Sequence, residues 1–114
     1  MKSPERAERL YLTDARDAID RILSYTTTGR DGFLSDRMLQ DAVVRNLEII
    51  GEAVKHVTAD TRAKRPDVPW SAIAGMRDRL IHDYFRVDLN IAWDVVANDL
   101  APLRAALNTL LNAE

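Results

Sequence analysis

The residues that can do chemistry concentrate in one short stretch of this 114-residue chain. Residues 77–84 read Arg-Asp-Arg-Leu-Ile-His-Asp-Tyr and hold one of the two histidines, two arginines, two carboxylates and a tyrosine. Arginine binds a phosphate through its planar guanidinium, and histidine transfers protons near neutral pH. An enzyme that cleaves RNA without a metal ion needs little more than these two abilities, so this segment is the candidate active site.

In this hypothesis the 2′-hydroxyl of RNA attacks the adjacent phosphate, which leaves a 2′,3′-cyclic phosphate and a free 5′-hydroxyl. His82 acts as general base or acid, a role worth about 10²–10⁴-fold in rate. Arg77 stabilises the charge that builds on the phosphoryl oxygens. Tyr84 positions the backbone, stacks on a base or donates a hydrogen bond. The sequence shows no histidine–carboxylate spacing typical of a zinc site, and we expect no cofactor.

The geometry of the segment depends on how far a helix extends through it. In a continuous helix Asp78 and His82 are neighbours, so the carboxylate would orient the imidazole, and Arg79 also lies beside His82. Arg77 and His82, five residues apart, then lie about 140° apart around the axis. They converge on one phosphate only if the helix ends near His82 or if a second copy of the chain completes the site. This geometry favours a site shared between two subunits.

The pattern alone leaves plainer interpretations open. Salt bridges around a partly buried histidine explain the same residue types, and for Arg79 and Arg86 a surface ion pair is the better default. Glu52 lines a cleft or pairs with Arg79, although a solvated or structural role is preferred. His56 closes a predicted helix, where it interacts with the helix dipole or with solvent.

Composition predicts one globular domain over residues 1–114. The chain has no cysteine, which excludes a disulfide framework and thiolate metal sites and suits a reducing cytoplasm. The charged N-terminus predicts no signal peptide. No segment approaches the roughly 18 uninterrupted apolar residues of a membrane span. We therefore expect a cytoplasmic protein that makes no contact with a membrane.

The net charge of −2 argues against a general nucleic-acid binder, but the charge is unevenly distributed. Residues 61–86 hold six basic and three acidic side chains, whereas residues 87–114 hold one basic and four acidic ones. The central segment can therefore attract a polyanion locally. A solvated charged face without a binding role stays an equally open interpretation.

Apolar residues recur every three to four positions along the chain, which predicts an all-α bundle. Strand-like alternation, internal repeats and low-complexity tracts are absent from the sequence. Four main helices and a short extra one form an up-and-down bundle. The main helices are expected over residues 5–26, 36–57, 70–84 and 89–111, and the short one over residues 59–65.

Several residues mark the expected helix ends. Gly29 fits the left-handed conformation that follows the first helix, and residues 30–34 are expected to form a loop. Ser35 is the expected N-cap of the second helix, and Asp88 that of the last. Pro102 removes a backbone hydrogen bond, so it predicts a kink or a break in the last helix.

The second helix is apolar over so wide an arc that we expect it to be covered by the bundle and by a second subunit. Gly51 in its middle costs about 1 kcal/mol relative to alanine. Close approach of a neighbouring helix gives a reason for this glycine. The stretch 70–84 is expected to loosen near Gly75.

The wider sequence resembles a known family. Arg77, His82 and Tyr84 match the Arg-x4-His-x-Tyr signature of HepT-like ribonuclease toxins in the HEPN superfamily, and Asp78 matches its preference for a small polar residue after the arginine. The resemblance spans roughly residues 36–103. Its most similar segments are residues 46–53, 68–76 and 87–100.

This resemblance implies an all-helical HEPN homodimer with two signatures facing each other across a basic cleft. It implies a metal-independent endoribonuclease toxin that cuts tRNA or mRNA in a type VII-like toxin–antitoxin system. It also implies neutralisation by a minimal nucleotidyltransferase (MNT) antitoxin that transfers AMP to Tyr84. The bulky anionic adduct would fill the cleft and repel the RNA backbone.

Two other functions fit the same sequence. The chain can be a non-catalytic HEPN module that binds a nucleotide or a nucleotidyltransferase partner, or a plain helical dimerisation protein. The intact pair of Arg77 and His82 favours the nuclease, because a module that only binds has no need for a proton-transfer residue. In the nuclease Asp78, Arg79 and Tyr84 support the two catalytic residues.

Overall fold

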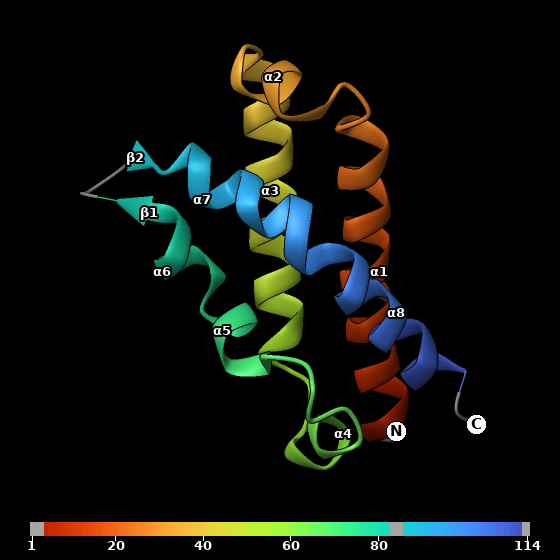
Figure 1. The fold of residues 1–114 in the computed structure, drawn as a ribbon. Coiled ribbons are helices and arrows are strands. Elements are labelled where there is room, and N and C mark those ends of the chain that lie inside the picture. Colours follow the sequence, from red (N-terminus) through yellow and green to blue (C-terminus); the bar gives the residue numbers. More distant parts are fainter. Residues whose placement is uncertain (1–3, 83–85, 113–114) are drawn as a thin grey trace.

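The computed structural model describes residues 4–82 and 86–112 and confirms the predicted all-α fold class (Figure 1). Two long helices, α1 (Pro4–Tyr25) and α3 (Arg37–Val54), pack side by side, and the C-terminal helical segment crosses them. The described helices include none that is long and apolar enough to span a membrane. The other elements are α2 (Gly29–Leu34), α4 (Ala59–Ala63), α5 (Trp70–Ala74), α6 (Met76–Leu80), β1 (Ile81–His82), β2 (Arg86–Val87), α7 (Leu89–Asp94), the π-helical turn η1 (Val95–Asp99) and α8 (Leu100–Leu111).

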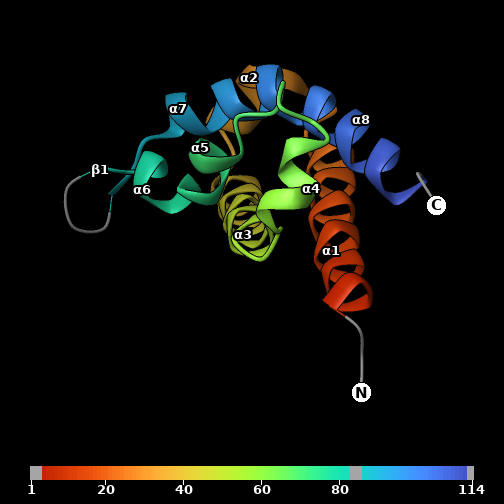
Figure 2. The same ribbon diagram turned by 90° about the horizontal axis from the view of Figure 1, so that it is seen from below.

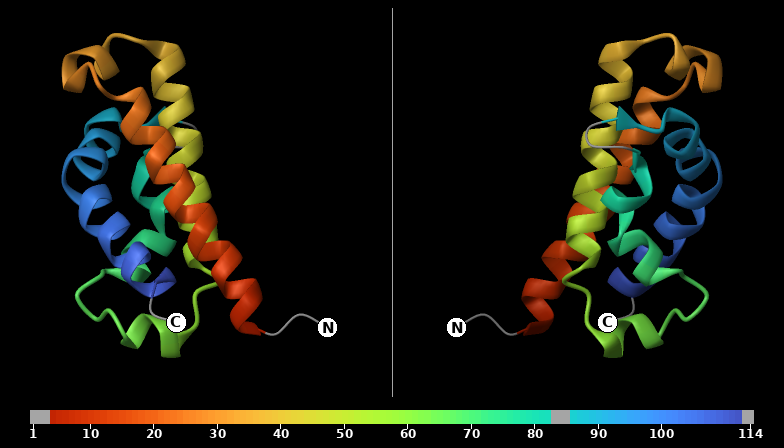
Figure 3. Two further views of the ribbon diagram at one scale, coloured as in Figure 1. Left: turned by 90° about the vertical axis from the view of Figure 1, so that its right-hand side faces the viewer. Right: turned by 90° about the vertical axis from the view of Figure 1, so that its left-hand side faces the viewer.

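The core lies where α3 meets its neighbours. Helix α3 contacts α1 on one side and α5 and α6 on another, and α8 packs against α1 (Figures 2 and 3). The apolar stripes predicted for the long helices are confirmed, since Ile19, Ile22, Leu47, Ile50 and Leu107 are fully buried. Each such side chain contributes about 1.5–3 kcal/mol of hydrophobic stabilisation. These contacts fix the helices that carry the candidate site.

Gly51 lies at the closest approach between α3 and the segment α5–α6, as predicted. A Cβ atom on this residue would lie 2.9 Å from the Cβ of Met76 and 3.1 Å from the carbonyl oxygen of Ile73. The predicted loosening at Gly75 is also confirmed, because this residue separates α5 from α6. The glycine in α3 therefore sets the distance between α3 and the helix that begins the signature.

The segment before α3 differs from the prediction. Residues 30–34, expected as a loop, belong to the short helix α2, which buries the ring of Phe33 in the core. Ser35 does not cap α3, because its hydroxyl donates to the carbonyl of Asp31 at 2.8 Å at the end of α2. Asp36 is the N-cap instead, and its carboxylate accepts a hydrogen bond from the backbone N–H of Leu39 at 3.1 Å. Gly29, as predicted, has a positive φ of 77°.

The last helical stretch is interrupted, as Pro102 predicts. Helix α7 passes into the π-helical turn η1 before α8 begins, which places Pro102 in the first turn of α8. A proline is tolerated there because its missing N–H needs no intrahelical partner. Asp88 caps α7, as predicted, by accepting hydrogen bonds from the backbone N–H groups of Asn90 and Ile91 at 3.0 and 3.1 Å.

A carboxylate on α1 holds the short helix α4 in place. Glu8 accepts hydrogen bonds from the backbone N–H of Thr58, at 2.7 Å, and from the hydroxyl of Thr61. Partial burial disfavours the charged form, but the hydrogen bonds from Thr61 and Thr58 outweigh it and lower the pKa of Glu8. The charged carboxylate therefore stabilises the folded chain.

Replacing Glu8 by glutamine should flatten the acid dependence of stability. Because the folded-state pKa lies below the usual value of about 4.5, Glu8 stabilises the protein fully above that pH. Its contribution is lost as the pH falls through the lowered folded-state pKa. Urea unfolding from pH 6 to pH 3 should show the two proteins furthest apart at high pH and converging on acidification, and parallel curves would contradict this.

Candidate active site

The predicted helix across the whole signature is wrong. Helix α6 ends at Leu80, and the next two residues form β1, which pairs with β2 so that Ile81 lies opposite Val87. The backbone N–H of Asp88 donates to the carbonyl of Leu80 at 2.7 Å. The helix stops because its last carbonyl is bonded by the returning chain, and the short sheet continues the chain in an extended direction.

This early end changes the geometry of the signature. Arg77 and Asp78 lie on α6 and are exposed, whereas the backbone of His82 belongs to β1. Both the contact between Asp78 and His82 and the separation of about 140° between Arg77 and His82 were expected for a continuous helix. Neither expectation applies, because the helix ends before His82. Of the two conditions for convergence, the end of the helix before His82 is met within one chain. Tyr84 and the side chain of His82 lie outside the described residues.

Arg77 lines a pocket of about 190 Å³ between α3 and the segment α5–α6. Glu52 lies in this pocket, as one interpretation of the sequence expected, but its ion-pair partner is Lys55 at 3.4 Å rather than Arg79. Gly51 and Ala74 form the narrow part where the helices touch. The remaining lining residues are Arg45 and Glu48.

A second and larger pocket of about 590 Å³ continues along α3 toward β2. Arg45 and Glu48 line both pockets, so the two form one hollow that we call the α3 groove. Partly buried apolar side chains form one wall of the larger pocket, and polar side chains form the rest. The apolar residues are Val44, Val87 and Leu89, and the polar ones are Arg37, Gln40, Asp41, Arg45, Glu48 and Arg86.

The α3 groove is basic on balance. It is lined by five basic side chains and three acidic ones. Two of the basic residues lie on α3 and a third is its C-cap, and none of the three belongs to the basic segment 61–86 predicted from the sequence. The spacing of three or four residues between charged positions on α3 is the signal that marks them as one face. The basic residues are Arg37, Arg45, Lys55, Arg77 and Arg86, and the acidic ones Asp41, Glu48 and Glu52.

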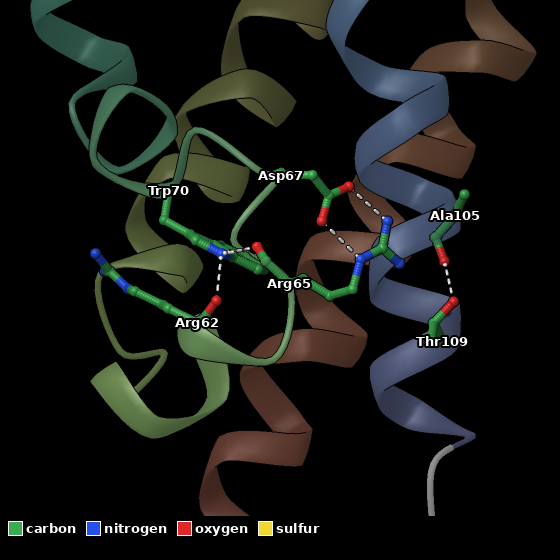
Figure 4. A network of polar contacts seen from close by, with 6 residues as sticks. All are labelled: Arg62, Arg65, Asp67, Trp70, Ala105 and Thr109. Carbon is green, nitrogen blue, oxygen red and sulfur yellow. Dashed lines mark hydrogen bonds and ion pairs between the residues drawn. The ribbon is translucent and has the colours of Figure 1, made fainter.

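Two arginines of the predicted basic segment make structural hydrogen bonds outside the groove. The guanidinium of Arg65 donates to both carboxylate oxygens of Asp67, at 2.9 and 2.8 Å, and these bonds lower the pKa of Asp67 (Figure 4). Arg62 donates to the carbonyls of Val57 and Val54, each at 3.0 Å. The carbonyls of Arg62 and Arg65 in turn accept the indole N–H of the buried Trp70. These arginines therefore stabilise the loop before α5 and do not line the groove.

Arg79 and His56 have structural partners. Arg79 pairs with Asp99 of η1 at 3.6 Å and lines neither pocket of the groove, in agreement with the default of a surface ion pair. The ring of His56 stacks on that of Tyr11, with centroids 4.2 Å apart and planes 11° from parallel. This contact ties the end of α3 to α1, and the helical pattern of the sequence does not predict it.

The all-α bundle and the basic groove beside the arginine–histidine signature place this chain in a class of helical nucleases. The chain belongs to the ribonuclease HepT-like family, whose profile matches residues 15–110. This match confirms the resemblance and the ribonuclease class predicted from the sequence.

Individual relatives cover almost the whole chain. The chain is 40% identical over 107 residues to a protein of Thermococcus cleftensis named "Probable ribonuclease HepT", with 93% of this chain and 97% of that protein covered. It is 38% identical over 114 residues to a protein named "Putative RNase" from Caldanaerobacter subterraneus subsp. tengcongensis, with 100% and 99% covered. No solved structure gives a significant match.

Proposed function

We propose that this protein is a metal-independent endoribonuclease that uses Arg77 and His82 as its catalytic pair. The observation that carries the proposal is the position of Arg77, exposed on a helix within the basic groove of a chain that belongs to a ribonuclease family. A guanidinium in such a groove suits an RNA phosphate, because it offers two parallel donors and keeps its charge.

The proposed reaction exchanges one phosphate ester for another. The bond from the 2′-oxygen to phosphorus forms as the bond to the 5′-oxygen breaks. His82 either accepts the proton of the 2′-hydroxyl while water protonates the leaving 5′-oxygen, or protonates the 5′-oxygen while water takes up the 2′-hydroxyl proton, so protons balance over the step. Arg77 binds the phosphoryl oxygens whose negative charge grows in the transition state. Tyr84 positions the RNA backbone. The carboxylate of Asp78 lies in the first turn of α6, where its negative charge interacts favourably with the helix dipole.

We further propose that the enzyme acts as a homodimer. Leu34 and Met38, near the corner between α2 and α3, are 36% and 83% exposed, although both are large apolar side chains. Contiguous exposed apolar patches mark protein–protein contacts, and we assign these two neighbouring side chains to the contact between subunits. The early end of α6 removes the geometric need for a shared site, so the proposal rests on this exposed surface and on the family resemblance.

The proposed biological role is that of a cytoplasmic toxin in a type VII-like pair, with tRNA or mRNA as its target. An MNT antitoxin transfers AMP from ATP to the hydroxyl of Tyr84, two residues after His82, and pyrophosphate leaves. The adduct adds a bulky anion beside the residues that bind the RNA phosphate, and like charges repel. Membership of the HepT-like family supports this role.

Mass spectrometry tests the modification. Co-expression with a cognate MNT protein should add the mass of one adenylyl group per chain and abolish RNA cleavage. The Tyr84→Phe variant should stay unmodified, and the antitoxin should not lower its activity below that of the variant alone. An adduct on another residue, or an inactive protein without any adduct, would contradict this route.

RNA cleavage by the purified protein in excess EDTA tests the nuclease itself. We expect fragments that end in a 2′,3′-cyclic phosphate and begin with a 5′-hydroxyl. These termini are distinguished by their response to phosphatase and to polynucleotide kinase. Binding of RNA or of a nucleotide without cleavage would instead support the non-catalytic HEPN module.

A further inference from the structure

Three arginines of the α3 groove differ from the rest of the chain. Within residues 4–82 and 86–112, every other arginine contacts a partner through a hydrogen bond, an ion pair or another electrostatic or ring interaction. Arg45, Arg77 and Arg86 have no such partner among the described residues, and all three are exposed. The arginines without partners thus all line one groove.

Positive charges that share a groove without hydrogen-bond or ion-pair partners repel one another. An anionic ligand removes this repulsion and satisfies the guanidinium donors, which match phosphate oxygens in spacing. Arg77 is assigned to the scissile phosphate under the proposed function. Arg45 and Arg86 line the larger pocket that continues from it, so they are placed for phosphates elsewhere on the same ligand.

The larger pocket also offers a place for a base. Its volume of about 590 Å³ suits a ligand of the size of a nucleotide. Val44, Val87 and Leu89 form a partly buried apolar wall beside the two arginines. An unstacked nucleotide has the matching chemistry, since its base has an apolar face and its phosphate is anionic.

The hairpin links this pocket to the signature. Arg86 lies directly opposite His82 in the two-stranded ladder of β1 and β2. A phosphate bound at Arg86 is therefore placed next to the phosphate on which His82 acts. Arg45, on α3, faces the same hollow from the other side and also lines the pocket of Arg77.

We infer that the α3 groove binds single-stranded RNA next to the cleavage point, with Arg45 and Arg86 holding backbone phosphates and the apolar wall holding one unstacked base. This inference rests on the proposed function and adds a binding subsite to it. It names Arg45 and Arg86 as positioning residues and selects single-stranded RNA over duplex.

The test is equilibrium binding of a fluorescent, fully 2′-O-methylated oligoribonucleotide of roughly 12 nucleotides, a length within the range of single-strand sites. This probe has no free 2′-hydroxyl and therefore stays uncleaved on the wild-type protein. Arg45→Gln and Arg86→Gln should each weaken binding by about fivefold or more at low salt. Each should also reduce the slope of log Kd against log salt by about 0.7, because one phosphate contact is lost. A hybrid of the same probe with its complement should bind more weakly than the single strand.

Lys64→Gln is the matched control, since it removes one positive charge from the exposed end of α4, outside the groove. An equal loss of affinity in this variant would show a general charge effect and overturn the inference. So would an unchanged salt slope in the double variant of Arg45 and Arg86, or a defect confined to binding of a protein partner. Thermal unfolding of each variant confirms that the fold is retained.

Cleavage kinetics separate this inference from the proposed function. With cleavable RNA, the double variant should raise KM while kcat stays within about twofold, which a merely structural defect would not do. A wild-type protein that binds the probe with the expected slopes but cuts no RNA would sink the nuclease and leave the binding site standing. A wild-type protein that cuts RNA, with a double variant of unchanged KM and salt slope, would sink the binding site alone.

Discussion

Replacing Arg77 by alanine should slow RNA cleavage by about 10²–10³-fold, and replacing His82 by alanine should slow it by about 10²–10⁴-fold. The arginine variant loses the donors that stabilise the transition-state charge, and the histidine variant loses the group that transfers the proton. Single-turnover cleavage of an end-labelled RNA, with enzyme in excess and EDTA present, measures both effects without interference from product release.

Two controls make this result specific. Arg77→Lys keeps the charge but loses the planar fork, so its rate should lie between those of wild type and alanine variant. Lys64→Ala removes a positive charge outside the groove and should leave the rate unchanged. Arg77 is exposed on α6, so its truncation leaves the core intact, and the melting temperature should stay close to that of the wild type. Wild-type rates in both alanine variants would exclude this pair as the catalytic residues.

The sequence predicts the long helices well because each repeats its apolar positions over several turns. The stripe on α3 is predicted in this way, whereas the cap at Asp88 is predicted from its residue type just before the last helix. Helix α2 was missed because its six residues make less than two turns, too few for a period to be visible. What makes α2 part of the fold is the burial of Phe33, a tertiary contact that local sequence does not show.

The end of α6 could not be predicted for a related reason. The residues from Met76 to Leu80 and those that follow have no proline or glycine to stop a helix. The stop comes from a hydrogen bond between Asp88 and Leu80 and from the pairing of Ile81 with Val87. These contacts join residues six to eight positions apart through a hairpin, so only the folded chain reveals them.

The sequence predicts only some of the residues that line the site. The signature identified Arg77, but the basic character was assigned to residues 61–86 as a block. In the folded chain Arg62 and Arg65 are used internally, and α3 supplies Arg45 to the groove. A count of charges along a segment does not distinguish an arginine that binds a backbone carbonyl from one that lines a groove. The hydrogen-bond partners of each arginine in the folded chain do distinguish them.

Alanine in place of Gly51 should destabilise the protein by up to about 2 kcal/mol, because overfilling a packed contact costs roughly 1–3 kcal/mol and alanine regains about 1 kcal/mol of helix propensity. The new Cβ would lie 2.9 Å from the Cβ of Met76 and 3.1 Å from the carbonyl oxygen of Ile73. Neither atom belongs to the flexible end of a side chain, so α3 and α5–α6 must move apart.

Gly75→Ala is the matched control, because it changes the same residue type in the same contact region. Its Cβ would meet nothing nearer than the carbonyl oxygen of Ser71 at 3.5 Å, and its φ of −87° suits alanine. Urea unfolding should therefore show Gly75→Ala at or above wild-type stability and Gly51→Ala well below it. Because the contact at Gly51 is with Met76, the residue before Arg77, RNA cleavage should fall in the Gly51 variant even where it remains folded. A Gly51→Ala protein as stable and as active as Gly75→Ala would contradict this role of the glycine.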